Sequence, residues 1–282
     1  MRVLFVYNPF SGHYAIKRKL KYIKRELAPL YDEFKIVASI SVNHFRQVVH
    51  DSAPKYDLLL VSGGDGTVNM TINILCRLEK RPVLGIIPTG TLNDAVKNFG
   101  NPTSFKRTIQ MIKKSIVKDV DILKVNNRYA AYTACCGAYS DIPLVTSPKA
   151  KRYFGRLAYY VKALPRLFKK RIITGSINAN GRRIPIRTSF LIVMNGERIA
   201  GFRINKGGST SNGKVDILYS RPRRFNSIFT FLFNKKHIKC ITTTNFEIDI
   251  DKKIAWDFDG EQGPKGPLKG EILPGFLSIL SE

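Results

Sequence analysis

The stretch 63–66, Gly-Gly-Asp-Gly, is the part of the sequence best suited to chemistry on phosphate. It follows an apolar run at 58–61 and precedes a segment in which apolar residues recur with helical spacing. Glycines permit a tight turn and a close approach of backbone to ligand, and the first turn of a helix offers unpaired N–H groups to an anion. A carboxylate beside phosphates, here Asp65, is normally accompanied by a divalent cation. The stretch therefore predicts a phosphate site with a bound cation.

The same four residues also form a common turn sequence, and many such turns bind nothing. Two familiar phosphate-binding patterns do not fit this stretch. A P-loop ends in Gly-Lys-Ser/Thr, and the dinucleotide fingerprint places a third glycine where Asn69 stands. By itself the motif leaves a plain turn and a phosphate loop equally open.

Two more polar loops are expected at the same edge of a sheet. The probable strands 2–7 and 83–87 end in Asn8-Pro9-Phe10-Ser11-Gly12 and in 88–94, Pro-Thr-Gly-Thr-Leu-Asn-Asp. Alternating strands and helices predict a parallel sheet, whose ligands bind at the carboxyl ends of the strands. For Thr91 and Asn93, each taken alone, helix capping is favoured over ligand binding. The further expected elements are a strand at 33–38 and helices at 13–27, 45–49, 92–99 and 104–115.

The sequence texture changes near residue 119 to short alternating strands. Asn126-Asn127 and Asn180-Gly181 are hairpin turn sequences between them. The second half is therefore predicted to be mainly antiparallel β. Its expected strands are 120–125, 129–134, 172–178, 188–194, 215–219, 238–250, 254–258 and 277–280.

Three carboxylates gather near the end of the chain, at Asp257, Asp259 and Glu261. The chain as a whole has only 21 acidic residues against 47 basic ones. Asp-Gly is a common turn dipeptide, which would explain the cluster structurally. The alternative is phosphoryl transfer, in which one acid takes the proton of an attacking hydroxyl.

The net charge of +26 points to a polyanionic partner, either nucleic acid or an anionic membrane surface. The segment 149–171 carries nine bases, several aromatic residues and no acid. Such a segment suits a membrane interface, although a core-packing amphipathic helix would have the same composition. Four cysteines without CxxC spacing, no apolar run near ~20 residues and no signal peptide predict a cytosolic protein with reduced thiols.

Four motifs in order resemble the diacylglycerol kinase family, and more broadly its superfamily with sphingosine and NAD kinases. They are Asn8-Pro9-Phe10-Ser11-Gly12, the stretch 63–69, the stretch 88–94, and Asp259-Gly260-Glu261. The resemblance implies an α/β nucleotide-binding domain with a parallel sheet at 1–120. It implies a β-sandwich-like, lipid-accepting domain at 121–270, with ATP and Mg²⁺ in the cleft between the two. The final strand, 271–282, is expected to pack back on the first domain.

The resemblance also assigns roles to residues. Glu261 or Asp259 would be the catalytic base, and Asp65 would act through Mg²⁺ on the phosphates. The expected nucleotide contacts are Asn8, Pro9, Phe10, Ser11, Gly12, Gly63, Gly64, Asp65, Gly66, Thr67, Val68, Asn69, Thr91 and Asn93.

The sequence departs from the family pattern in two places. Met70 stands where the family usually has Glu, which weakens any contact made by that position. The acid-rich metal loop of bacterial members corresponds to 206–216, where Asp216 is the one remaining carboxylate. Asp216 is thus a weak candidate metal ligand.

These observations favour a lipid kinase acting on a diacylglycerol-like substrate from the inner surface of the membrane. A kinase of a soluble compound such as NAD remains an alternative, as does a non-catalytic nucleotide- or nucleic-acid-binding protein. The sequence does not single out the acceptor lipid.

Overall fold

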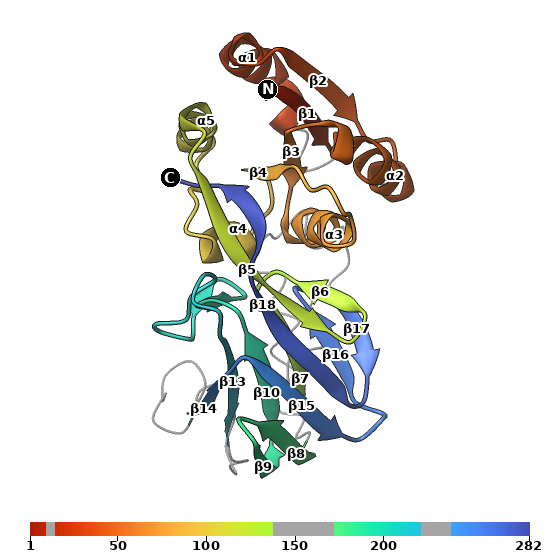
Figure 1. Ribbon diagram of the computed structural model, residues 1–282, viewed down its shortest axis with the longest axis vertical. Helices are drawn as coiled ribbons and strands as arrows, with labels where there is room; N and C mark the ends of the chain where they lie inside the picture. Colours follow the sequence, from red (N-terminus) through yellow and green to blue (C-terminus); the bar gives the residue numbers. More distant parts are fainter. Residues whose placement is uncertain (10–14, 138–171, 221–237) are drawn as a thin grey trace. The chain divides into compact units, whose positions relative to one another are not determined.

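The computed structural model describes residues 1–9, 15–137, 172–220 and 238–282, and these form two compact units (Figure 1). The first unit comprises Met1–Asp121 and Gly275–Glu282, and the second comprises Ile122–Pro274. The chain passes from one unit to the other within β5 (Val117–Val125) and again within β18 (Leu268–Leu280). Phe10, Ser11, Gly12 and the whole basic segment 149–171 lie outside the described residues.

The first unit is built on a parallel sheet, as the alternating pattern predicts. Its strand order is β2-β1-β3-β4, and the end of β18 continues it parallel to β4, with Ile279 opposite Leu84. The strands β1, β3 and β4 are almost entirely buried, which is why they appear in the sequence as continuous apolar runs. The strands are β1 (Arg2–Tyr7), β2 (Glu33–Ala38), β3 (Leu58–Gly63) and β4 (Val83–Pro88).

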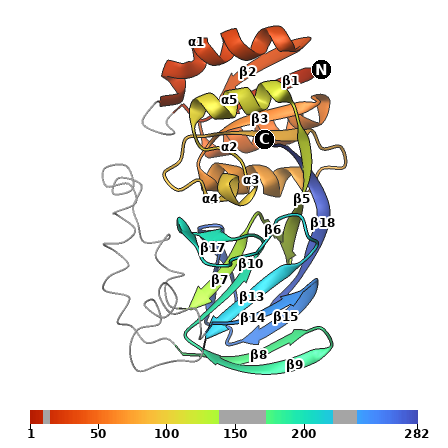
Figure 2. The same ribbon diagram turned by 90° about the vertical axis from the view of Figure 1, so that its left-hand side faces the viewer.

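Helices cover both faces of this sheet (Figure 2). Helices α1 (Ala15–Leu27) and α5 (Phe105–Lys114) share one core cluster with Val3, Phe5 and Leu60 of the strands. Helices α2 (Val42–Ser52) and α3 (Asp65–Leu75) contact the strands and each other. Each fully buried aliphatic side chain of α1, such as Ile23, contributes about 1.5–3 kcal/mol.

Helix α2 is longer than the predicted segment 45–49 because it begins with a side-chain cap. The Ser41 hydroxyl accepts a hydrogen bond from the His44 amide at 3.0 Å. The remaining helical segments of the first unit are η1 (Ala28–Leu30), η2 (Ala53–Lys55) and α4 (Asp94–Asn98).

The second unit has two antiparallel sheets around a shared core and a small two-stranded sheet, β11-β12, in agreement with the predicted β-rich half. One sheet has the order β14-β13-β10-β7-β16-β17, and the other joins β18, β15, β8 and β9, with β5 and β6 alongside. Trp256 and Phe246 are buried between them, and the Trp256 indole N–H donates to the Gly266 carbonyl at 2.8 Å. The strands are β6 (Arg128–Ala130), β7 (Thr133–Gly137), β8 (Ile173–Ala179), β9 (Arg182–Thr188), β10 (Phe190–Met194), β11 (Arg198–Ile199), β12 (Phe202–Arg203), β13 (Val215–Ser220), β14 (Ile238–Thr243), β15 (Asn245–Ile250), β16 (Ala255–Phe258) and β17 (Glu261–Lys265).

The sequence predicts a single strand at 238–250, but the structure has two strands there. Strand β14 pairs with β13 in one sheet, whereas β15 pairs with β8 and β18 in the other. The chain changes sheets around Thr244, where the Thr243 hydroxyl donates to the Asn245 carbonyl at 2.7 Å. Both halves have β-forming side chains, so the sequence alone does not reveal the break.

Candidate active site

The turn that follows β3 in the first unit leads directly into helix α3. Gly64 is the N-cap of α3 and has no side chain to cap the helix. The Gly64 carbonyl instead accepts the amides of Thr67 and Val68 at 2.9 and 3.1 Å. The remaining N–H groups of the first turn and the positive end of the helix dipole suit an anion.

The loops that follow β3 and β4 touch through their backbones at Gly64 and Gly90. A Cβ atom built on Gly64 would lie 3.0 Å from the Gly90 Cα, and one built on Gly90 would lie 2.6 Å from the Gly64 Cα. Neither position has room for a larger residue without moving backbone. The glycines therefore hold the β3–α3 turn against the loop that follows β4. Gly90 is a site residue that the sequence-based assignment missed, although the motif 88–94 contained it.

Asp65 joins the same two loops through its carboxylate. Its Oδ1 accepts the Ala95 amide at 3.0 Å, and the amides of Asn93 and Asp94 also donate to the carboxylate. Burial raises the pKa of Asp65 and these amides oppose the rise, while the nearby charge of Asp94 adds to it. Asp65 thus organises the amino end of α4 in addition to any role at phosphates.

Asn93 occupies the N-cap position of α4, but its side chain does not cap the helix, although side-chain capping was the alternative to ligand binding. Its backbone is left-handed, with φ of 52°, and its side chain makes no cap hydrogen bond. The side-chain amide donates to the Gly90 carbonyl at 2.9 Å, but its Oδ1 is buried and has no hydrogen-bond partner in the described chain. An unsatisfied buried acceptor costs about 1–3 kcal/mol. The unsatisfied Oδ1 keeps Asn93 a candidate for contact with a ligand donor or a cation.

The other predicted contact residues are placed less uniformly. Thr91 is exposed at the loop, and Asn8 lies at the end of β1 with its amide 3.5 Å from the Ser62 carbonyl. Val68 is buried on the core side of α3 and serves packing. Met70 contacts α2, where its sulfur accepts the Arg46 Nε–H at 3.3 Å. The structure therefore brings together 63–67 and 90–95, whereas Val68 and Met70 point elsewhere.

In the second unit, Asp259 is a fully engaged carboxylate. It is 2% exposed and accepts the amides of Ala131, Tyr132 and Thr133 at 2.6, 3.1 and 2.9 Å. Its φ of 51° lies in the left-handed region, so the turn depends on these bonds. Glu261, two residues later, is exposed at the start of β17. Asp259 is built to position the turn, and Glu261 is accessible.

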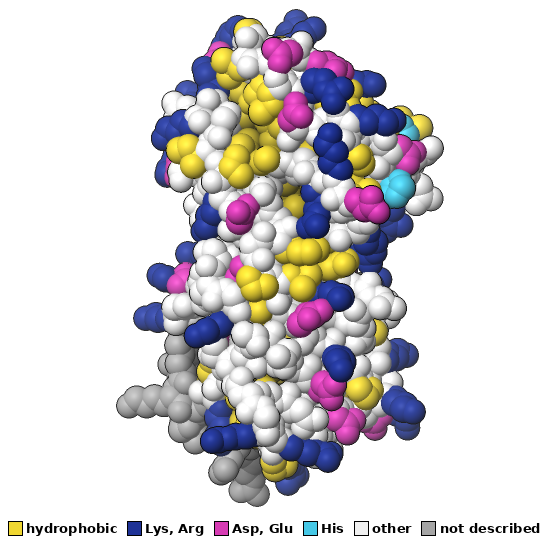
Figure 3. Space-filling model, viewed as in Figure 1, with side chains coloured by type: hydrophobic (Ala, Val, Ile, Leu, Met, Phe, Trp, Pro, Cys, Tyr) yellow, Lys and Arg dark blue, Asp and Glu magenta, His cyan; other side chains and the backbone are white. Residues whose placement is uncertain are grey.

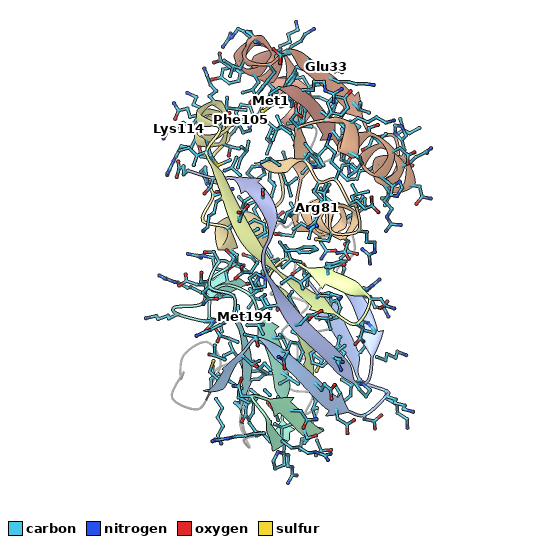
Figure 4. All side chains as sticks on the ribbon, in the orientation of Figure 1. Met1, Glu33, Arg81, Phe105, Lys114 and Met194 are labelled. Atoms are coloured by element: carbon cyan, nitrogen blue, oxygen red, sulfur yellow. The ribbon has the colours of Figure 1, made fainter. Side chains whose placement is uncertain are left out.

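Asp257 lies beside an apolar cluster on the face of the β7/β10/β16 sheet away from the unit's main core. It pairs in register with Cys135, so the two side chains share that face. Its Oδ1 accepts the Gly260 amide at 2.8 Å. Burial first, and then the charge of Asp257, raises the pKa of the Cys135 thiol. The cluster on this face consists of Phe190, Ile192, Met194 (labelled in Figure 4), Ile204 and Leu218.

The surroundings of Asp216 do not fit a metal ion. Its carboxylate oxygens accept the Asn205 side-chain amide at 2.6 Å and the Thr242 hydroxyl at 2.5 Å. In the described part of the chain no three His, Cys, Asp or Glu side chains gather as metal ligands. Divalent oxygen-binding cations prefer sites with several carboxylates or with nucleotide phosphates. Hydrogen bonds between neutral side chains and Asp216 hold this region together.

Comparison with known proteins places this geometry in a family. Residues 2–125 match the diacylglycerol kinase catalytic domain model. Over 295 residues the chain is 32% identical to a diacylglycerol kinase of Staphylococcus carnosus (strain TM300), covering 99% of this chain and 92% of the relative. The chain belongs to the diacylglycerol kinase family.

Other members of the diacylglycerol kinase family agree over the same length. The chain is 26% identical over 283 residues to a diacylglycerol kinase of Bacillus subtilis (strain 168), covering 96% of this chain and 93% of the relative. A crystal structure of a diacylglycerol kinase from Bacillus anthracis str. Sterne has a TM-score of 0.85 and 26% identity, covering 100% of this chain and 97% of that one. As a diacylglycerol kinase family member, the chain is a phosphotransferase with an alcohol group as acceptor.

Proposed function

We propose that this chain is an ATP- and Mg²⁺-dependent lipid kinase that phosphorylates the hydroxyl of a diacylglycerol-like lipid. The observation that carries the proposal is the contact between Gly64 and Gly90, with the Asp65 carboxylate bonded across the same two loops. This arrangement presents backbone amides and a helix amino end without any side chain in the way, which is what polyphosphate binding requires.

ATP fits the residues of the first unit. The stretch 63–67 and the exposed Thr91 would contact its phosphates, and the buried Oδ1 of Asn93 would find a partner. Mg²⁺, when bound, would neutralise phosphate charge beside Asp65 and make the γ-phosphorus easier to attack. Asn8, Pro9 and the adjoining stretch 10–12 are proposed contacts on the strength of the motif alone.

Glu261 is the proposed general base, and Asp259 is the proposed positioning residue. Glu261 would accept the proton of the acceptor hydroxyl as the hydroxyl oxygen bonds to the γ-phosphorus and ADP leaves. Asp259 cannot easily serve as the base, because three backbone amides already occupy its carboxylate. The carboxylate of Glu261 is exposed and is not held by backbone amides of the described residues in this way.

A lipid acceptor is supported by the apolar cluster beside Asp257 and by the names of the relatives. A sheet that has apolar side chains on both of its faces can pack a core on one and an acyl chain on the other. The basic chain would work in the cytoplasm, bound peripherally to the anionic inner surface of the membrane. No helix in the described part of the chain is long and apolar enough to span a bilayer.

Phosphate transfer from Mg·[γ-³²P]ATP to diacylglycerol in neutral detergent micelles tests the proposal. The parent protein and Glu79→Gln, a change of an exposed carboxylate elsewhere in the first unit, should label the lipid equally. Glu261→Gln should reduce kcat by about 10²–10⁴-fold while ATP still binds. Label appearing in NAD but not in lipid would identify a soluble-substrate kinase, and ATP binding without transfer to either would refute the catalytic assignment.

A further inference from the structure

Helices α1 and α5 form one layer of the first unit, and their outward side is strongly basic. Helix α1 has six basic residues and one acid, and α5 has four basic residues and none. The Tyr22 and Phe105 rings pack at 5.7 Å between centroids, and the Lys19 ammonium lies 4.1 Å from the Phe105 ring. These contacts hold the helices side by side, so their charges belong to one surface.

Few of these charges are neutralised within the unit. Glu26 pairs with Arg25 and Lys113, and Arg107 pairs with Glu282. Both Arg25 and Lys113 therefore share one carboxylate. Four exposed lysines have no ion pair with any residue that the structure describes, namely Lys21, Lys24, Lys106 and Lys114. Lys114 extends outward from the carboxyl end of α5 in Figure 4.

Exposed apolar side chains lie at the carboxyl ends of the same two helices. Leu30 is 50% exposed just after α1, and Ile116 and Val117 are each 49% exposed just after α5. The ion pair between Lys113 and Glu26, at 3.1 Å, joins the last turns of the two helices and so brings these helix ends together. Figure 3 shows hydrophobic side chains on the surface of the first unit, with Lys and Arg and several Asp or Glu side chains around them. We call the bases of α1 and α5 together with Leu30, Ile116 and Val117 the basic helix face.

We propose that the basic helix face binds the anionic phosphate layer of a lipid bilayer. Lysines attract lipid phosphates, and short apolar side chains next to them can enter the boundary between headgroups and acyl chains. Nucleic acid would match the charge but would leave Leu30, Ile116 and Val117 exposed to water or to phosphates. The inference rests on the proposed function only in that it names the membrane that carries the lipid, and it uses none of the residues 149–171.

Charge removal at the face provides the test, with a control of equal net charge. The first variant is Lys21→Gln/Lys24→Gln/Lys106→Gln/Lys114→Gln. The control is Lys55→Gln/Lys80→Gln/Lys252→Gln/Lys253→Gln, four exposed lysines away from the face. Sedimentation with vesicles of phosphatidylglycerol and phosphatidylcholine measures binding without ATP. Each lysine at a bilayer surface strengthens binding roughly fivefold, so the first variant, which removes four, should bind roughly 600-fold more weakly.

A second variant tests the apolar part of the face. Ile116→Ser/Val117→Ser should weaken vesicle binding by a factor that is nearly independent of salt, whereas the contribution of the four lysines should shrink as salt is raised. Thermal unfolding of every variant establishes that it is folded before binding is compared.

Three outcomes would overturn the proposal. The first is equal loss of vesicle binding in the face variant and the control, which would make total charge the cause. The second is no loss in either variant. The third is tighter binding of the parent to duplex DNA than to anionic vesicles, carried by the same four lysines. Kinase activity in neutral detergent micelles needs no docking, so it reports on the proposed function separately.

Discussion

Replacing Gly90 by alanine should disable the candidate site through a displacement that the structure allows to be estimated. The new Cβ would lie 2.6 Å from the Gly64 Cα and 2.7 Å from the Asn93 Oδ1. An ordinary van der Waals contact begins at 3.4 Å, so the two loops must separate by about 0.8 Å. Both loops are backbone at this point, and no side-chain rotation can relieve the contact.

A misplacement of about 1 Å at an active site can cost about 100-fold in rate. We therefore expect Gly90→Ala to lower kcat/KM for phosphate transfer from Mg·ATP to diacylglycerol by about 100-fold, equivalent to about 2.7 kcal/mol. Calorimetric titration should show weaker ATP binding as well, because the same contact shapes the proposed phosphate site.

The control is Gly181→Ala in the β8–β9 turn of the second unit. Gly181 has a φ of +71° and no atom within 4 Å of an added Cβ, so alanine there strains the turn without a clash. That strain costs about 1–2 kcal/mol of stability and should leave kcat/KM within about threefold. If Gly90→Ala kept both its kcat/KM and its ATP affinity within threefold of the parent, the backbone contact would not shape the site and our reasoning would be refuted.

Three further predictions concern the carboxylates. Asp259→Asn should lower the free energy of unfolding by about 2 kcal/mol, because its new NH₂ group faces backbone amide donors. Glu261→Gln should change the free energy of unfolding by less than about 0.5 kcal/mol. Equal losses of stability in urea titrations of the two variants would contradict the division of roles. Burial raises the folded-state pKa of Asp65 above its unfolded value, so ionisation of this carboxyl lowers the stability of the parent as pH rises between the two pKa values. The melting temperature of Asp65→Asn relative to that of the parent should therefore be higher at pH 7 than at pH 4. A difference in melting temperature that does not change with pH would contradict the raised pKa. Chelation with EDTA should leave the melting temperature of the nucleotide-free protein unchanged. Asp216→Ala should lower the free energy of unfolding by about 1.5–3 kcal/mol, because its hydrogen bonds to Asn205 and Thr242 are lost. A lower melting temperature after chelation would show a bound structural cation.

The parallel sheet of the first unit and the β-rich second half are predictable from the sequence because each has a strong local signature. Strands β1, β3 and β4 are buried on both faces, so their residues form uninterrupted apolar runs. The polar loops at their carboxyl ends follow from the same topology. The break at Thr244 has no such signature, because β14 and β15 differ only in which sheet they join.

The individual roles within the candidate site depend on distant contacts that spacing does not encode. The sequence shows Gly64 and Gly90 in separate motifs, but their backbone contact appears only in the fold. Asp259 and Glu261 are equivalent candidates in the sequence. They are distinguished by amides at 131–133, more than a hundred positions away. The sequence likewise predicts that the Asn93 side chain caps the next helix. In the structure the Asp65 carboxylate accepts the amides of residues 93–95 instead.

Because β18 returns to the first sheet, the first unit is made of two separate chain segments, whereas the second is made of one. The second unit is a single uninterrupted segment, Ile122–Pro274, whereas the first needs Gly275–Glu282 to finish its sheet. Residues from that returning segment are held by the Asn101 side chain, which donates to the Leu280 carbonyl at 2.7 Å, and by Arg81, which donates to the Phe276 carbonyl at 2.6 Å. In architectural terms the second unit is an insertion between two neighbouring strands of the first. If the second unit holds the acceptor, as we propose, its exchange should alter the acceptor while the loops at Gly64 and Gly90 stay intact. A fragment ending at Asp121 would expose the edge of β4.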